Sequence, residues 1–167
     1  MFLAHHARKS HKPRMEQLDS TDTLLLTALQ RDAHITAEKL SETLHLSPSQ
    51  IGRRRQRLEA EGYIEGYRAH LSAQRLGLQI QALVSVQMAT HDPVKVQTFT
   101  RILKARSEIT SVWTLTGEAD YLLRVYCCGL PDLNSLIHEV LLPHPAVARV
   151  QSQIVMDQLK DDAPLPV

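Results

Sequence analysis

Four of the five residues from Arg53 to Arg57 are arginines, within the stretch LSPSQIGRRRQRLEAEGYI. The planar guanidinium group donates hydrogen bonds in a fixed fork that matches phosphate oxygens and the major-groove edge of guanine. An arginine cluster is also common on a solvated helix face, where it pairs with carboxylates one turn away. The choice between a nucleic-acid contact and a solvated basic face depends on how a helix presents these side chains.

The arginine stretch begins with the signals of a helix N-terminus. Ser47 is placed to cap the helix, Pro48 fills the first helical position, and Gln50 completes a capping box. At about 100° per residue, Ile51 and Leu58 share one apolar side. We expect Arg54 and Arg55 to flank that side, and the outward side to carry Ser49, Gln50, Arg53, Gln56 and Arg57.

Two shorter amphipathic segments precede this helix. The first is predicted over residues 21–31, and its apolar positions are Leu18, Leu25, Leu26 and Leu29. The second is predicted over residues 37–45, with Thr36 as its cap and Leu40 and Leu44 on one face. Only a few residues separate it from the arginine helix. Helices joined by so short a turn must cross steeply, which predicts a helix-turn-helix.

The second half of the chain changes character. Residues 80–88 alternate between apolar and polar, which is the pattern of a half-buried strand, and Asp92 and Pro93 then begin a helix. Two strands joined by the turn GEAD, a further helix and a last strand follow. The order βαββαβ predicts a ferredoxin-like sandwich, so the fold class is α+β. The sheet face without helices carries Leu83 and Trp113 or Leu115, and we expect it to meet another subunit.

These patterns divide the chain into five segments. They are a disordered basic tail over 1–14, a helix-turn-helix domain over 15–63, a β-arm and linker over 64–77, a ferredoxin-like domain over 78–160 and a C-terminal tail over 161–167. The arm is expected to be a strand or an extended segment from Ile64 to Leu71. Met15 opens the folded part and is a candidate alternative start of translation.

Charge and apolar content limit the possible functions. The net charge of +1 divides into +4 over residues 1–14, −2 over 15–70 and −1 over 71–167, so a DNA contact has to come from the placement of arginines. No apolar run approaches the ~20 residues of a membrane-spanning helix. Basic residues at the N-terminus lack the apolar stretch of a signal peptide. The only cysteines, Cys127 and Cys128, are adjacent, and adjacent cysteines pair only with strain. We expect a cytoplasmic protein.

Three stretches together resemble one family. They are LDSTDTLLLTALQRD from Leu18, LSPSQIGRRRQRLEAEGYIEGY from Leu46 and TGEADYLL from Thr116. In this order and spacing they resemble the leucine-responsive/asparagine regulator (Lrp/AsnC) family of transcriptional regulators. The resemblance implies a DNA-binding helix-turn-helix domain joined by a β-arm to a domain that binds an effector and forms oligomers. It also implies homodimers, often assembled into octamers, and a small effector such as an amino acid.

The resemblance assigns candidate DNA contacts on the arginine helix. The candidates are Ser47, Ser49, Gln50, Arg53, Arg54 and Arg57. Gln50 can read adenine and Arg53 guanine, whereas Arg54 and Arg57 are expected to hold phosphates. Arg55 stands where the family usually has an aliphatic residue, so its role is left open.

The turn TGEADY is the candidate effector site. Gly117, Asp120 and Tyr121 fit the family pattern there, with Thr116 and Ser152 expected nearby on neighbouring strands. Asp120 would pair with the ammonium group of an amino acid. The alternative is an ordinary turn, in which Gly117 supplies a positive φ and Asp120 accepts from backbone N–H groups. Ala119 and Ala146 depart from the family pattern.

Other functions have less support in the sequence. No nucleophile and base form a recognisable pair, and no glycine-rich phosphate loop is present, so we expect no enzyme. The nine histidines show no metal-ligand spacing, so we expect neither a metal nor another cofactor. The alternative to a DNA-binding regulator is an effector-binding ferredoxin-like oligomer with weak or no specific DNA binding.

Overall fold

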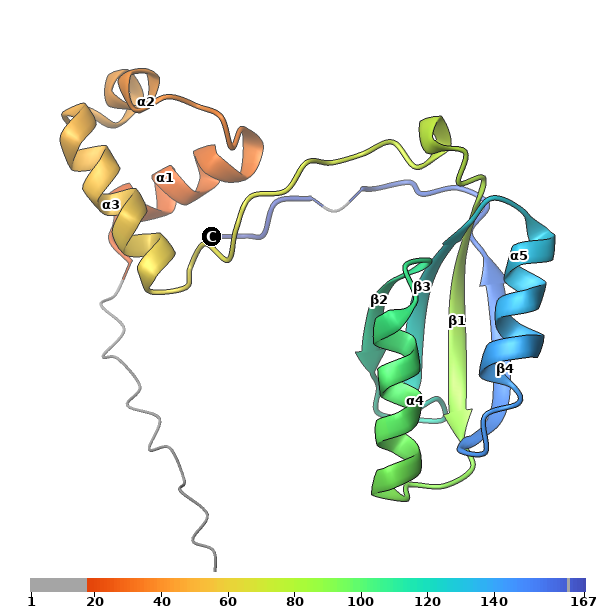
Figure 1. Ribbon diagram of the computed structural model, residues 1–167. Helices are drawn as coiled ribbons and strands as arrows, with labels where there is room; N and C mark the ends of the chain where they lie inside the picture. Colours follow the sequence, from red (N-terminus) through yellow and green to blue (C-terminus); the bar gives the residue numbers. More distant parts are fainter. Residues whose placement is uncertain (1–17, 162) are drawn as a thin grey trace, which may run out of the picture. The chain divides into compact units, whose positions relative to one another are not determined.

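The computed structural model describes residues 18–161 and 163–167. The predicted disordered tail over 1–14 and the candidate start at Met15 lie outside the described residues. The chain separates into two compact units (Figure 1). One unit contains the described residues up to Ala69 together with 163–167, and the other contains His70–Asp161. No helix in the described part of the chain has the length and apolar content to cross a bilayer.

The described part of the first unit contains three helices: α1 (Ser20–Arg31), α2 (Ala37–Leu44) and α3 (Pro48–Ala60). Asp19, Thr36 and Ser47 cap them by accepting hydrogen bonds from backbone N–H groups of the first turns. The predicted capping box of α3 is present, with Pro48 at the first helical position. The predicted helices therefore form, with bounds that differ by one or two residues.

An apolar core holds the three helices together. Its buried members are Leu25, Leu26, Leu29, Leu40, Ile51 and Leu58. His45 ends α2 in the left-handed region at φ 53°, which allows the short turn into α3. Gly62 has φ 79° after α3, and the following N–H groups of Tyr63 and Ile64 return to the carbonyl of Leu58 at 2.9 and 3.2 Å.

Of the two alternatives predicted for the segment after α3, a strand or an extended segment, the described chain does not contain the strand. The described residues 64–71 contain no strand, and a short 3₁₀-helix, η1 (Gln74–Leu76), forms where a linker was expected. A strand exists only where its backbone pairs with a neighbour, and the described chain offers this segment none. At the other end of the chain, the Leu165 backbone exchanges two hydrogen bonds with the Gln30 side chain on α1, at 2.6 and 3.2 Å.

The second unit contains the predicted βαββαβ order. Its elements are β1 (Ile80–Met88), α4 (Pro93–Ala105), β2 (Ile109–Thr114), β3 (Tyr121–Cys127), α5 (Leu130–Ser135), the π-helical segment η2 (Leu136–Leu141) and β4 (Val147–Ile154). The strands form one antiparallel sheet in the order β2-β3-β1-β4. Both helices cover the same face of this sheet (Figure 1). This is the ferredoxin-like arrangement, and the predicted α+β fold class is confirmed.

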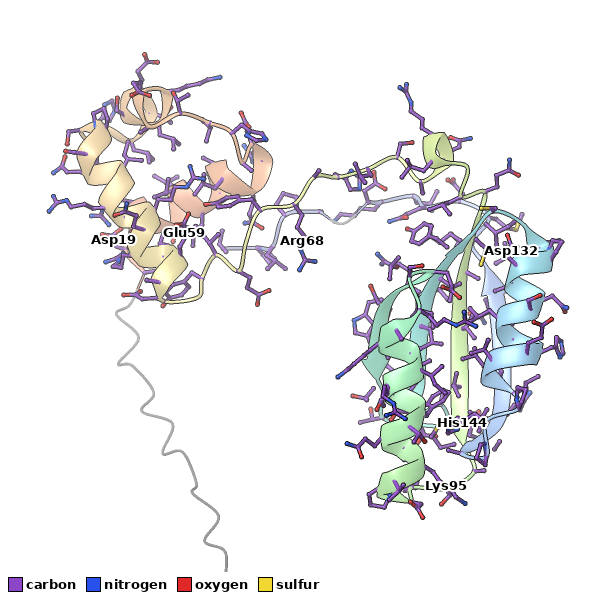
Figure 2. All side chains as sticks on the ribbon, viewed as in Figure 1. Asp19, Glu59, Arg68, Lys95, Asp132 and His144 are labelled. Carbon is purple, nitrogen blue, oxygen red and sulfur yellow. The ribbon has the colours of Figure 1, made fainter. Side chains whose placement is uncertain are left out.

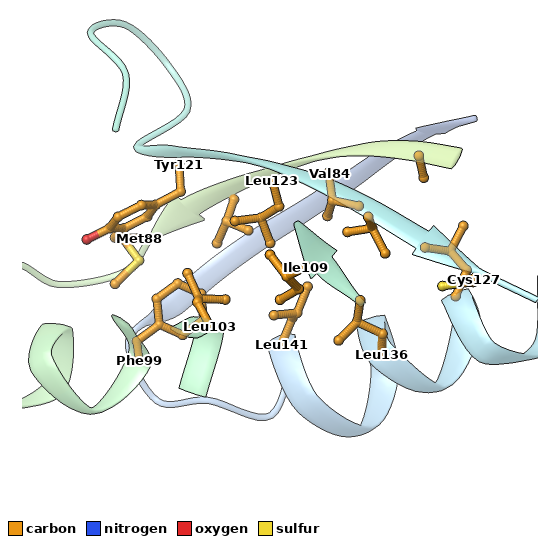
Figure 3. Close-up of a cluster of buried hydrophobic side chains, with 14 of the residues drawn as sticks. Val84, Met88, Phe99, Leu103, Ile109, Tyr121, Leu123, Cys127, Leu136 and Leu141 are labelled. Carbon is orange, nitrogen blue, oxygen red and sulfur yellow. The ribbon is translucent and has the colours of Figure 1, made fainter. Parts of the chain in front are cut away.

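The core of the second unit lies between the sheet and its helices. Figure 3 shows Phe99 and Leu141 from the helices pointing toward Val84 and Leu123 from the sheet. The sequence predicts a single helix between β3 and β4, but the second half of this helix is π-helical. Bonds from i to i+5 bring Leu136 and Leu141 onto one side of that helix, and both are buried.

The other face of the sheet carries exposed apolar side chains. Trp113 is 41% exposed and Leu115 43% exposed, and the Arg124 guanidinium lies 5.6 Å from the centre of the Trp113 ring. Leu83 stands directly opposite Arg124 in the register of β1 and β3. No helix of the described chain covers this face (Figure 1).

Candidate functional site

The outward face of α3 is polar and open. Ser49, Arg53 and Gln56 are exposed along it. No carboxylate within residues 18–161 and 163–167 pairs with Arg53. A hollow of about 280 Å³ runs beside this face and is lined by Leu46, Gln50, Arg53, Arg54 and Arg57.

Two of the predicted DNA contacts, Ser47 and Gln50, form the capping box at the start of α3. Gln50 Oε1 accepts from the Ser47 N–H at 2.9 Å and from the Ser47 hydroxyl at 3.0 Å. The Ser47 hydroxyl accepts in turn from the Gln50 N–H at 3.3 Å. A bidentate contact of Gln50 with adenine uses both its carbonyl and its amide groups. Such a contact would therefore break one side of the capping box.

Asp22 on α1 holds two of the arginines. Its carboxylate is 1% exposed and accepts from Arg54 Nη1 at 2.8 Å and from Arg57 Nη2 at 2.5 Å. Arg54 Nη1 also lies 2.7 Å from Oδ2 of Asp19, which Figure 2 labels at the start of α1. A buried carboxylate needs such partners because an unpaired charge is costly away from water. Arg57, expected on the outward side, is thus half-buried with its guanidinium turned toward α1.

The same arrangement affects Asp19. The backbone N–H of Asp22 and then the Arg54 guanidinium lower the pKa of Asp19 below its ordinary value of 3.8. Both groups stabilise the charged carboxylate. The sequence itself indicates that Asp22 needs a cationic partner, although the helix prediction did not use this signal. Asp22 lies four residues after Leu18 and three before Leu25, in the apolar stripe of α1, where a carboxylate requires a cation.

Arg55 has a partner in the segment that follows α3. Its Nε donates to the Tyr67 hydroxyl at 2.9 Å, and its guanidinium lies 4.7 Å from the centre of the Tyr67 ring. Glu59, labelled on α3 in Figure 2, accepts from the same hydroxyl at 2.9 Å and from Arg55 at 3.3 Å. Burial, followed by the hydrogen bond to Glu59, raises the pKa of Tyr67. Arg55 therefore ties the extended segment to α3.

The turn between β2 and β3 places Asp120 at the end of β1. Asp120 Oδ2 accepts from the Met88 N–H at 2.7 Å, and the Asp120 N–H donates to the Val86 carbonyl at 3.0 Å. Oδ1 lies 4.0 Å from Nε2 of His91. Gly117 has φ 119°, a conformation that side chains rarely allow. Asp120 thus closes the turn through one oxygen and presents the other beside an exposed histidine.

Of the remaining predicted effector residues, only Thr116 shares the turn's exposed surface, whereas Tyr121 and Ser152 do not. Thr116 is exposed in the turn, but Tyr121 is buried on the helix side, with its ring 5.7 Å from that of Phe99. Ser152 was expected nearby on a neighbouring strand. It lies on β4, opposite Val84 of β1, so it is next to β1 but separated from β2 by β1 and β3.

A hollow beside the turn contains residues that the sequence did not suggest. Its volume is about 220 Å³, and it is lined by Ser85, Gln87, Glu118, Ala119, Arg149 and Gln151. Glu118 and Arg149 approach to 3.8 Å, and both are largely exposed. The register of β1 and β4 places Gln87 opposite Arg149 and Ser85 opposite Gln151, which explains why these four residues share one face of the sheet.

Metal-binding groups and paired thiols are not part of these sites. Among the described residues, no three His, Cys, Asp or Glu side chains are arranged to hold a metal ion. Cys127 is buried and Cys128 exposed, and both are free thiols. Burial, followed by the charge of Asp132, raises the pKa of Cys127.

Known proteins match both units. The model of the AsnC-type helix-turn-helix domain matches residues 18–59, and that of the Lrp/AsnC ligand binding domain matches residues 81–165. The leucine-responsive regulatory protein of Haemophilus influenzae is 30% identical over 158 residues, which cover 95% of each chain. The DNA-binding transcriptional activator DecR of Escherichia coli is 28% identical over 150 residues, or 90% of this chain and 99% of DecR.

Solved structures agree with the sequence matches. A transcriptional regulator from Neisseria meningitidis, solved with L-Met, superposes with a TM-score of 0.85 at 33% identity, over 90% of this chain and 97% of that one. An AsnC family regulator from Agrobacterium tumefaciens gives a TM-score of 0.82 at 25% identity, over 89% and 97%. The chain described here belongs to the Lrp/AsnC family of DNA-binding transcriptional regulators.

Proposed function

We propose that α3 contacts DNA through its outward face and that Arg53 is the principal base-reading residue. The observation that carries this proposal is the division among the arginines. Arg54 and Arg57 are held by Asp22 and Arg55 by Tyr67, whereas Arg53 is exposed and unpaired within the described chain. An extended guanidinium on the N-terminal half of a recognition helix can reach guanine in the major groove.

Ser49 and Gln50 complete the proposed contact at the start of α3. The Ser49 hydroxyl lies 3.1 Å from that of Ser47, so both can turn toward a phosphate at the helix N-terminus. The Gln50 amide nitrogen can donate while its carbonyl stays in the capping box. Arg54 and Arg57 are assigned a positioning role, because a guanidinium paired with a carboxylate attracts phosphate less than an unpaired one does.

One such helix offers few contacts, so the proposed regulator binds two or more half-sites. The sheet face with Leu83, Trp113 and Leu115 is the proposed homodimer surface, because Trp113 and Leu115 are exposed in a single chain. When two weakly binding recognition helices are joined in a dimer, binding of the first raises the effective concentration of the second at its half-site, and the affinity for DNA rises. We propose in addition that the homodimers assemble into an octamer and that the protein is cytoplasmic. In this proposal residues 15–63 bind DNA, residues 64–77 form the connecting arm, and residues 78–160 bind the effector and form the oligomer.

An amino acid is the proposed effector. The regulator from N. meningitidis was solved with L-Met, and the matching domain model is that of a ligand-binding domain. Asp120 Oδ1 is placed to accept from an ammonium group, and Gly117 leaves the turn open to close approach. Thr116 is the neighbouring hydroxyl in this turn. Tyr121 supports the site from the core, and Ser152 has no role in it within one chain.

The experiment for the DNA contact measures binding to a duplex selected by the protein from a randomised library, over a series of salt concentrations. Arg53→Ala should weaken binding by about 5- to 150-fold and relax one base position. Arg31→Ala, which removes an exposed arginine from α1, is the matched control and should leave binding close to wild type. A selection that enriches no sequence would instead favour an effector-binding oligomer without specific DNA binding.

The experiment for the effector measures thermal stability in the presence of each common amino acid, L-Met included. Asp120→Asn keeps a carbonyl for the Met88 N–H but removes the charge, so it should abolish a ligand-dependent rise in Tm without unfolding the turn. His91→Ala is the control for the exposed neighbour. A rise that persists in Asp120→Asn would place the ammonium group elsewhere.

A further inference from the structure

Gly52 stands in the middle of the recognition helix, immediately before Arg53. Glycine in a helix interior is less favourable than any residue except proline, because it loses the most backbone freedom on folding. The usual structural reasons for a glycine do not apply at this position. Gly52 does not have a positive φ, and a Cβ added to it would meet no atom of the described chain within 4 Å.

The position of Gly52 on the helix is informative. It lies three residues after Ser49 and four before Gln56, so these three residues follow one another along the outward face. Arg53 borders the same face. The buried side of α3, marked by Ile51 and Leu58, points the other way. The surface proposed to contact DNA therefore has a residue without a side chain at its centre.

We infer that Gly52 is a close-approach position of the DNA interface, where nucleic acid occupies the space that a side chain would fill. This inference rests on the proposed function of α3. A helix with its side chains is about 10 to 12 Å across, and the major groove is about 12 Å wide. Removing one side chain from the groove-facing side lets the helix backbone lie closer to the bases. The Arg53 guanidinium then reaches the base edges from a shorter distance.

This role predicts opposite effects of one substitution on stability and on binding. Gly52→Ala should raise the Tm of the helix-turn-helix unit by about 4 °C, since alanine favours a helix and the new methyl group has room. The same methyl group should weaken binding to the selected duplex by about fivefold or more, because it enters a closely packed contact. A glycine without a functional role predicts the gain in Tm and no loss of binding.

A reciprocal substitution in the same helix separates the two effects. Ala60→Gly removes a methyl group from the exposed last residue of α3 and should lower Tm without a change in binding. The double variant Gly52→Ala/Ala60→Gly should then have a Tm near wild type and still bind weakly. Binding is measured on the full chain, with the duplex that the wild-type protein selects from a randomised library.

Arg53→Ala in the same experiment distinguishes failure of this inference from failure of the proposed function. Weaker binding in both Arg53→Ala and Gly52→Ala supports the close approach. If Arg53→Ala weakens binding and Gly52→Ala binds as well as or better than wild type, the inference is overturned and the proposed interface stands. If neither variant changes binding, or if the wild-type protein selects no duplex, both are overturned.

Discussion

Nη1 of Arg54 on α3 lies 2.8 Å from Oδ1 of Asp22 on α1, and the Asp22 carboxylate is 1% exposed. Arg57 reaches the other oxygen of the same carboxylate. The two helices are therefore held together by a buried charged group in addition to their apolar contacts. Because hydrogen bonds to a carboxylate are directional, this pairing fixes how α3 is rotated against α1, and so which residues face outward.

Removing the charge of Asp22 should destabilise the helix-turn-helix unit. Asp22→Asn leaves two half-buried arginines without a counter-charge, and breaking such an arrangement costs about 3 kcal/mol. Denaturant unfolding followed by circular dichroism measures the loss. Glu42→Gln, an exposed substitution on α2, is the control and should stay within about 0.5 kcal/mol of wild type. An Asp22→Asn protein of unchanged stability would show that apolar packing alone holds α3.

Arg57→Ala distinguishes a positioning residue from a phosphate contact. The ion pair with Asp22 predicts a lower Tm and little change in the salt dependence of DNA binding. A direct phosphate contact predicts instead that the slope of log K against log salt becomes shallower by about 0.9, at unchanged Tm. Unfolding and salt-dependent binding of the same protein sample therefore give opposite results for the two roles.

Stability should fall in acid partly through Asp19. Its pKa is lower in the folded protein than its ordinary value of 3.8, so the charged carboxylate stabilises the fold above that pH. This contribution is lost as the pH falls through the lowered pKa. Asp19→Ser keeps a capping hydroxyl but does not titrate. The difference in Tm between wild type and Asp19→Ser should shrink from pH 6 to pH 3, and a constant difference would contradict the assignment.

The segment that follows α3 should become mobile when its link to the helix is removed. Arg55→Val abolishes both the hydrogen bond to the Tyr67 hydroxyl and the contact with its ring. Backbone NMR relaxation should then show larger ps–ns motion at residues 65–69. Because the link is only partly buried, the free energy of unfolding should change by at most about 1 kcal/mol. Arg68→Ala, in the same segment, is the control.

The two thiols should react at different rates. Cys128 is exposed, whereas Cys127 is buried and has a raised pKa, so little of it is thiolate at neutral pH. A thiol reagent at pH 8 should modify one group rapidly and the second only in denaturant. Cys128→Ser should remove the rapid reaction. Equal rates for both groups would mean that the strand end containing Cys127 opens readily.

Local patterns in the sequence were sufficient for the elements and their caps. Ser47, Pro48 and Gln50 predicted the start of α3, and alternation predicted β1, because both signals involve residues close together in the chain. The same alternation places Tyr121 with the buried residues of β3. The inward direction of its side chain was therefore available from the sequence, although the family pattern suggested an effector contact.

Long-range pairing explains the parts that the sequence did not predict. The contacts of Asp22 with Arg54 and Arg57 join residues more than thirty positions apart, and no helical spacing indicates them. Arg55 and Tyr67 meet only because Gly62 turns the chain after α3. Of the two alternatives predicted for residues 64–71, the strand needed a pairing partner that the described chain does not supply. Ser152 was misplaced because its neighbours follow from the strand order rather than from distance along the sequence.

The strand order also has a consequence for how the chain folds as it is synthesised. The three helices pack among residues that leave the ribosome close together, so the first unit can fold early. In contrast, β1 lies in the centre of the sheet, between β3 and the last strand, β4. Until β4 emerges, β1 has one unpaired edge, and such an edge can recruit strands from other chains. A nascent or truncated protein that ends before Val147 would therefore be prone to aggregation while carrying a folded DNA-binding unit.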